Sequence, residues 1–139
     1  MIKITGGEPF ADMLTLSKVM YRIGYSDKIP RIYIYTNGRI LGTVLGNEKC
    51  GGVLRGVNGF SIGIHEDQFM TWQDYKKLFR LIVSYTDVEP RGIRFIGIEG
   101  MASKELVDRL TIASANVILL PLNKDCSLAD EDKIVLEGV

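Results

Sequence analysis

The chain opens with Met1-Ile-Lys-Ile-Thr-Gly-Gly-Glu-Pro-Phe10, and this stretch decides the fold. Ile2 and Ile4 alternate with polar residues, which predicts a short strand. The strand leads directly into Gly6 and Gly7. A glycine pair at the carboxyl end of a strand lets the main chain approach a ligand closely, because no Cβ intervenes. The alternative is that the pair serves only a tight turn before the next helix.

Apolar segments and helical patterns alternate along the rest of the chain. Strands are expected at Arg31–Thr36, Phe60–Ile64, Ile93–Ile98 and Val117–Leu120, and helices over the apolar stripes from Phe10 to Ile23, Trp72 to Val83 and Leu106 to Ala113. The glycine-rich stretch from Leu41 to Gly59 predicts only one or two short helical turns. Strand–helix alternation of this kind predicts an α/β fold with a parallel sheet and right-handed crossovers.

Composition narrows the classes of function. The 139 residues include 17 basic and 17 acidic side chains. The sequence therefore has no excess of positive charge of the kind that binds nucleic acid. No apolar run approaches the ~20 residues that cross a membrane. The amino terminus lacks the pattern of a signal peptide, and we therefore expect a cytoplasmic protein. Residues 1–123 are expected to form one domain, and residues 124–139 an acidic tail or a short added strand.

Polar side chains follow the predicted strands. They are Glu8, Asn37, His65, Glu66, Glu99 and Asn123. Because the carboxyl ends of parallel strands lie on one edge of a sheet, we expect these side chains to share one rim, where ligands of α/β folds bind. Loops are polar in any case, so this distribution alone does not define a site.

Two motifs carry a resemblance to a known family. A strand followed by Thr5-Gly-Gly-Glu-Pro-Phe10, and the next strand followed by Thr36-Asn37-Gly38, resemble the core of the radical S-adenosylmethionine (AdoMet) superfamily. The resemblance covers roughly residues 2 to 121. It implies a partial (β/α) barrel of about five strands, similar to the family's (β/α)6 core without its first strand.

The resemblance also implies binding residues. In that family the Gly-Gly-Glu-Pro segment binds the amino group of AdoMet, which points to Gly6, Gly7, Glu8 and Pro9. The ends of later strands contact the ribose and the carboxylate, which points to Ser61, His65 and Glu99. Asn37 belongs to the second motif on the same rim. The adenine is expected near residues 120–122.

The family's cluster ligands are missing from this sequence. A Cys-x-x-x-Cys-x-x-Cys loop precedes Gly-Gly-Glu-Pro in the family, whereas only five residues precede Gly6 here. Cys50 and Cys126 cannot supply three thiolates, so we expect no 4Fe–4S cluster in cis and no reductive cleavage of AdoMet by this chain alone. Three functions stay open: a cluster-less domain that binds AdoMet or a related nucleoside, a piece of a truncated or split radical enzyme, and an interaction or structural module with a vestigial pocket.

Several residues have a simpler alternative role. Glu8 could favour the positive end of the following helix, and His65 could be an ordinary surface residue rather than a base. Without a preceding strand, Ile2 to Thr5 would form an open edge, which predicts a homodimer or a partner chain docked there. Alternatively, Lys3 protects that edge in a monomer.

Overall fold

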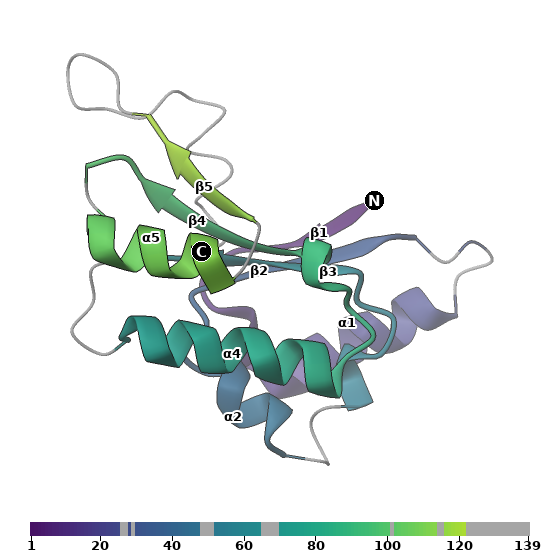
Figure 1. Cartoon of the computed structure of the whole chain (residues 1–139). Helices are drawn as coiled ribbons and strands as arrows, with labels where there is room; N and C mark the ends of the chain where they lie inside the picture. Colours follow the sequence, from purple (N-terminus) through teal and green to yellow (C-terminus); the bar gives the residue numbers. More distant parts are fainter. Residues whose placement is uncertain are drawn as a thin grey trace.

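Five strands form one sheet in the computed structural model, which describes residues 1–25, 28, 30–47, 52–64, 70–100, 102–113 and 116–121 (Figure 1). The strands are β1 (Ile2–Ile4), β2 (Ile32–Thr36), β3 (Gly59–Gly63), β4 (Ile93–Ile98) and β5 (Val117–Leu120). Every neighbouring pair is parallel, and the order across the sheet is β1-β2-β3-β4-β5. The predicted α/β fold with a parallel sheet is confirmed.

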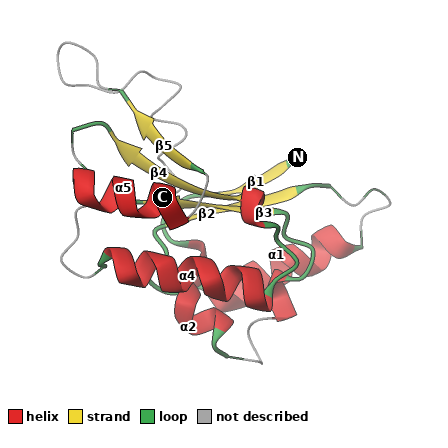
Figure 2. Cartoon of the chain, viewed as in Figure 1, coloured by secondary structure: helices red, strands yellow, loops and turns green. Residues whose placement is uncertain are grey.

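The helices form a second layer on one side of this sheet. They are α1 (Met13–Gly24), α2 (Leu41–Leu45), α4 (Trp72–Tyr85) and α5 (Lys104–Ala113), with short 3-10 turns η1 (Pro9–Ala11), η2 (Gly52–Leu54) and η3 (Pro90–Gly92). When sequential parallel strands are joined by crossovers of one hand, all helices fall on one face. Figures 1 and 2 show this arrangement, and within the described residues the opposite face of the sheet carries no helix.

The core lies between the sheet and the helices. Alternate strand residues point into it and are almost fully buried: Ile32, Ile34, Phe60, Ile62, Ile93 and Phe95. From the helix layer, the buried Tyr75 meets Phe95 edge-on, with 6.0 Å between ring centroids. Since the inward residues alternate with residues that face the other way, each strand also presents a second set of side chains to the helix-free face.

Local sequence fixes where the helices begin. The hydroxyl of Thr71 accepts a hydrogen bond from the amide of Asp74, and the Asp74 carboxylate accepts one from the amide of Thr71, so a capping box begins α4. Asp12 caps α1 through the amide of Thr15, and Ser103 accepts from the amide of Leu106 in the first turn of α5. In the described residues of the glycine-rich stretch, which leave out 48–51, the helical elements are the short α2 and η2, in line with the short helical turns expected there.

Several sequence-based predictions concern residues outside the described part of the chain. They include the acidic tail from residue 124 onward and the added strand over 134–136. Among the helices that are described, none combines the length and the apolar character needed to cross a membrane.

Candidate functional site at the carboxyl rim

The carboxylate of Glu8 joins the ends of the first two strands. It accepts hydrogen bonds from the hydroxyl of Thr36 and, at 3.3 Å, from the amide of Asn37. Thr36 closes β2 and is completely buried. Its hydroxyl also accepts from the amide of Gly38 at 3.0 Å. Glu8 therefore fixes the Gly-Gly-Glu-Pro corner to the Thr-Asn-Gly turn, which places the two sequence motifs side by side.

Burial dominates the electrostatics of this carboxylate. Desolvation raises the pKa of Glu8, and hydrogen bonds from Thr36, Asn37 and the amide of Phe10 only partly oppose that rise. The helix-end role considered from the sequence is secondary: the amide of Phe10 in η1 affects the Glu8 pKa least of the three donors, and no side-chain hydrogen bond of capping geometry forms at η1. Its main contacts are across the sheet, to β2.

The glycine pair adopts a left-handed main-chain conformation. Gly6 has a φ of 90° and Gly7 a φ of 55°, and both residues are exposed. A Cβ built on either glycine would meet no heavy atom within 4 Å. Among the described residues, no hydrogen bond to the amides or carbonyls of this pair is found. The corner therefore offers main-chain donors and acceptors to the surroundings, with open space beside them.

The chain after Glu8 anchors this corner to the core. Pro9 occupies the first turn of η1, where its missing N–H costs nothing. Phe10 is buried and packs near Phe60 of β3, with 6.5 Å between ring centroids. The exposed glycines are thus held between β1 on one side and a buried aromatic anchor on the other.

A different reason for glycine applies to the second motif. Gly38 has a φ of 83°, and a Cβ there would lie 2.8 Å from Cδ2 of Leu78 and 3.2 Å from Cγ2 of Ile62. The turn is further closed by the amide of Arg39, which donates to the side chain of Asn37 at 3.0 Å. A side chain at Gly38 would therefore be strained by the positive φ and would displace Leu78 of α4, whereas the first glycine pair is not crowded.

The pairing register decides which predicted site residues come together. Gly6, Gly7, Glu8 and Pro9 lie beside Asn37, since β1 pairs with β2. Glu99 lies at the carboxyl end of β4, but the register places it three residues beyond the level of Asn37. Three residues correspond to about 10 Å along a strand, so the rim is slanted and Glu99 lies well away from the glycine corner.

Ser61 is not at a strand end. It occupies the middle of β3, is completely buried, and lies on the helix-free face. Its hydroxyl accepts a hydrogen bond from Nη2 of Arg94 at 2.9 Å, and the same nitrogen lies 3.4 Å from the hydroxyl of Tyr35. Sequence reasoning did not single out Arg94 or Tyr35; a charged residue inside the otherwise apolar segment Ile93–Ile98 was the available signal.

The remaining candidate ligands fall outside the described residues. His65 cannot be placed, and neither can Cys50 or Cys126. Within the described part of the chain, no group of three or more His, Cys, Asp or Glu side chains is arranged to hold a metal ion. A 4Fe–4S cluster held by three thiolates does not fit these 139 residues, because they contain two cysteines.

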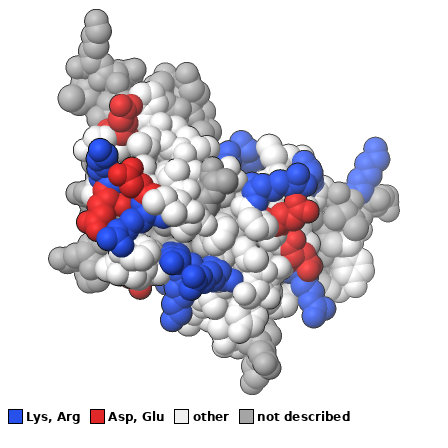
Figure 3. Space-filling model, in the orientation of Figure 1, with Lys and Arg blue, Asp and Glu red and all other residues white. Residues whose placement is uncertain are grey.

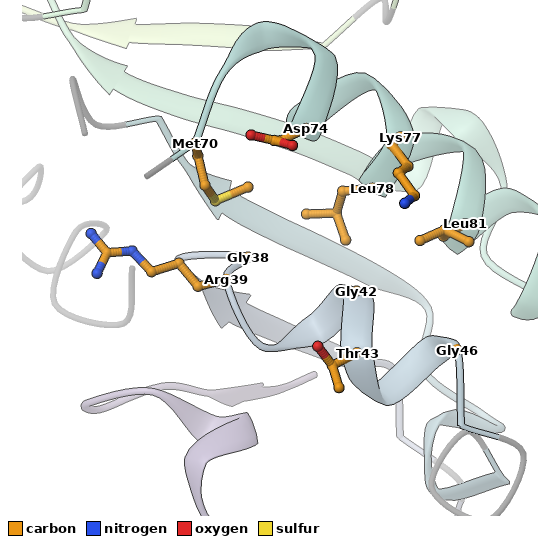
Figure 4. A pocket seen from close by; sticks show the side chains of 10 residues that line it. All are labelled: Gly38, Arg39, Gly42, Thr43, Gly46, Met70, Asp74, Lys77, Leu78 and Leu81. Atoms are coloured by element: carbon orange, nitrogen blue, oxygen red, sulfur yellow. The ribbon is translucent and has the colours of Figure 1, made fainter. Parts of the chain in front are cut away.

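A groove between α2 and α4 was not predicted. It has a volume of about 620 Å³ and is lined by Gly38, Arg39, Gly42, Thr43, Gly46, Met70, Asp74, Lys77, Leu78 and Leu81 (Figure 4). Its three glycines are four residues apart, and one of them, Gly42, lies within α2, while Leu78 and Leu81 extend from α4 toward the groove. The spacing of the glycines was visible in the sequence and is the signal that could have found the groove.

Acidic and basic side chains lie next to one another on the face shown in Figure 3. This mixed pattern agrees with the balanced formal charge of the sequence. The chain was also compared with known proteins. No protein-family model matches the sequence, and no curated protein is significantly similar to it.

Proposed function

We propose that this chain is a radical-AdoMet-like partial barrel that binds AdoMet or a related nucleoside at the glycine corner, and that it does not cleave AdoMet reductively by itself. One observation carries the proposal: an exposed, left-handed glycine pair, whose main-chain groups have no hydrogen-bond partner among the described residues, lies at the carboxyl end of β1 and is tied by Glu8 to the Thr-Asn-Gly turn. Ligands of parallel α/β sheets bind at that edge.

The sequential strand order supports the barrel relationship. Doubly wound sheets reverse their strand order and carry helices on both faces, whereas a barrel adds each strand beside the last and keeps all helices outside. The order β1-β2-β3-β4-β5 and the single helix layer follow the second pattern. The slanted rim is also what strand stagger produces in a barrel.

Each part of the corner has a proposed role. The main chain of Gly6 and Gly7 contacts the amino group of the ligand, and Glu8 positions this main chain through Thr36 and Asn37. His65 and Glu99 are proposed as contacts farther along the rim, and Ser61 as a contact on the helix-free face. Any radical chemistry would require iron–sulfur ligands from another polypeptide segment, as in a split or truncated enzyme.

Isothermal titration calorimetry with AdoMet and with S-adenosylhomocysteine tests the proposal. We expect saturable binding of both ligands, and at least tenfold weaker binding by Glu8→Ala, because the corner loses its connection to β2. Glu105→Ala is the matched control: Glu105 is an exposed glutamate on α5 whose ion pair with Arg109 lies far from the corner in the fold. Absence of binding by the unmutated chain would refute the nucleoside site.

The first strand favours a second candidate function, an interaction module. Within the described residues β1 pairs only with β2, so its outer edge carries unpaired main-chain groups. Ile2 and Ile4 are partly buried there, and Lys3 is exposed. We propose a homodimer or a partner strand along Ile2 to Thr5. Multi-angle light scattering that shows a monomer over the full accessible concentration range would contradict the homodimer.

A further inference from the structure

The helix-free face of the sheet carries a cluster of hydrogen-bond donors. Tyr35, Ser61 and Arg94 lie in one row across β2, β3 and β4, because the register pairs Tyr35 with Ser61 and Ser61 with Arg94. Residues paired in this way point to the same face of a sheet. Tyr35 and Ser61 are buried, and Arg94 is partly buried.

Hydroxyl groups hold the guanidinium of Arg94, and within the described part of the chain no carboxylate neutralises it. Nη2 donates to Oγ of Ser61 at 2.9 Å and lies 3.4 Å from the hydroxyl of Tyr35. No carboxylate of the described residues forms a salt bridge with it, although Arg91 and Arg109 each have such a partner. A partly buried cation without a counter-ion is costly in free energy, and an arriving anion would remove that cost.

The cluster offers donors rather than acceptors. Among the described residues only Nη2 of the guanidinium has a hydrogen-bond partner, which leaves the N–H groups of Nη1 and Nε. Because the hydroxyls of Ser61 and Tyr35 accept from arginine, their own hydrogens must point elsewhere. An acceptor-rich group with negative charge, namely a carboxylate or a phosphate, satisfies such an arrangement, and the fork of arginine fits either one in a bidentate manner.

One edge of the cluster is closed by an aromatic ring. Tyr33 lies one row nearer the amino ends of the strands on the same face, and a Cβ on Gly59 would come within 2.6 Å of its ring. The ring therefore lies across Gly59. An anion that reaches Arg94 would have this aromatic surface on its amino-terminal side, so the site suits an anionic group attached to a planar or apolar body.

From this arrangement we infer that the helix-free face binds a small anionic ligand, in which a carboxylate or phosphate is bound by Arg94 while Ser61 and Tyr35 orient the guanidinium. This inference is independent of the glycine corner. The anion belongs either to a separate molecule or to the amino-acid portion of the nucleoside ligand proposed above, and the two sources are separable by experiment.

The test uses the full chain labelled with ¹⁵N. The Nε–Hε signal of Arg94, assigned by its loss in Arg94→Gln, is followed during titration with inorganic phosphate, malonate and the neutral analogue malonamide. We expect saturable shifts of this signal and of the Tyr35 and Ser61 amides with the two anions only. Arg94→Gln keeps a side chain that can donate to Ser61 and should bind the anions at least tenfold more weakly.

Two further variants and a second ligand pair complete the test. Arg91→Gln is the matched control and should bind as the unmutated chain does, since Arg91 is exposed and paired with Glu89 at 2.6 Å. Arg94→Lys keeps the positive charge but loses the bidentate geometry of the guanidinium, and should weaken binding of both anions. It replaces Arg94→Gln in the test if that variant does not fold. Equal phosphate and malonate affinities in the unmutated chain and the Arg94 variants, or no saturable shift at all, would overturn the inference.

S-adenosylhomocysteine and 5′-methylthioadenosine distinguish the two sources of the anion, because only the first carries a carboxylate. If the anion belongs to the nucleoside ligand, Arg94→Gln weakens binding of the first compound and not of the second. If the anion belongs to a separate molecule, both compounds bind the variant as they bind the unmutated chain, while phosphate and malonate still depend on Arg94. Failure of both nucleosides to bind with intact anion binding would refute the proposed function and leave this inference standing.

Discussion

The glycines of the two motifs should respond differently to the same substitution. Gly38→Ala adds a methyl group at a φ of 83°, with Cδ2 of Leu78 at 2.8 Å and Cγ2 of Ile62 at 3.2 Å. Gly7→Ala adds a methyl group at a φ of 55°, where no heavy atom lies within 4 Å. The two variants therefore share conformational strain, and only Gly38→Ala also creates a steric clash.

The magnitudes follow from these two contributions. A left-handed conformation costs an L-residue about 1–2 kcal/mol. Forcing one extra methyl group into a packed core costs about 1–3 kcal/mol. Gly38→Ala should therefore lower the free energy of unfolding by about 2–5 kcal/mol, and Gly7→Ala by about 1–2 kcal/mol. A domain with a total stability of about 5–15 kcal/mol tolerates the second loss far better than the first.

Urea denaturation followed by circular dichroism measures both effects. We expect the midpoint to fall in both variants, more for Gly38→Ala, with an unchanged slope because the surface exposed on unfolding is the same. Calorimetry with AdoMet should then show at least tenfold weaker binding by folded Gly7→Ala. If Gly38→Ala is no less stable than Gly7→Ala, the packing of the turn against α4 is wrong. If Gly7→Ala binds AdoMet with unchanged affinity, the glycine corner is not the AdoMet-binding site.

Three further predictions concern single residues. The pKa of Glu8 in the folded chain is raised above 4.5 because the carboxyl is partly buried, so its contribution to stability is present below that pH and is lost as the pH rises through the higher folded value. Glu8→Gln should therefore gain stability relative to the unmutated chain as the pH rises from below 4.5, and a constant difference would contradict the burial of this carboxylate. Thr71→Ala removes the capping box with Asp74 and should cost about 0.5–2 kcal/mol in urea denaturation; no loss would mean that the cap is not formed in solution. Gly59→Ala places a Cβ 2.6 Å from the carbonyl oxygen of Gly92 and 2.6 Å from the ring of Tyr33, and should lower the melting temperature by several degrees. An unchanged melting temperature would contradict the close approach of β3 to Gly92.

The order of the elements was predictable because each has a strong periodic signal. Ile32, Ile34 and the apolar stripe of α4 show periods of two and of 3.6 residues, and these patterns alone specify strand or helix. Once strands alternate with helices, a parallel sheet follows. The proximity of Gly6 to Asn37 was then predictable as well, because consecutive parallel strands are usually neighbours.

Register and face could not be predicted from the sequence. The offset of Glu99 from the glycine corner depends on the stagger between β3 and β4. No residue pattern in either strand predicts that stagger. The segment Ile93–Ile98 is apolar on both faces, so Arg94 gave no sign of which side it faces. Its contact with Ser61 joins residues 33 positions apart and required the sheet pairing.

Crowding explains one glycine of the two motifs and not the others. At Gly38 one atom, Cδ2 of Leu78, would lie 2.8 Å from an added Cβ. Gly6 and Gly7 have no such neighbours, so lack of space does not explain them.

Their positive φ values are ones that glycine adopts readily, as a turn from β1 to η1 requires. Glu8 holds this corner against Thr36 and Asn37 at the expense of its own desolvation. A glycine turn that is fixed by a partly buried carboxylate, and that has no hydrogen-bond partner for its main chain among the described residues, is compatible with the preorganised ligand site proposed above.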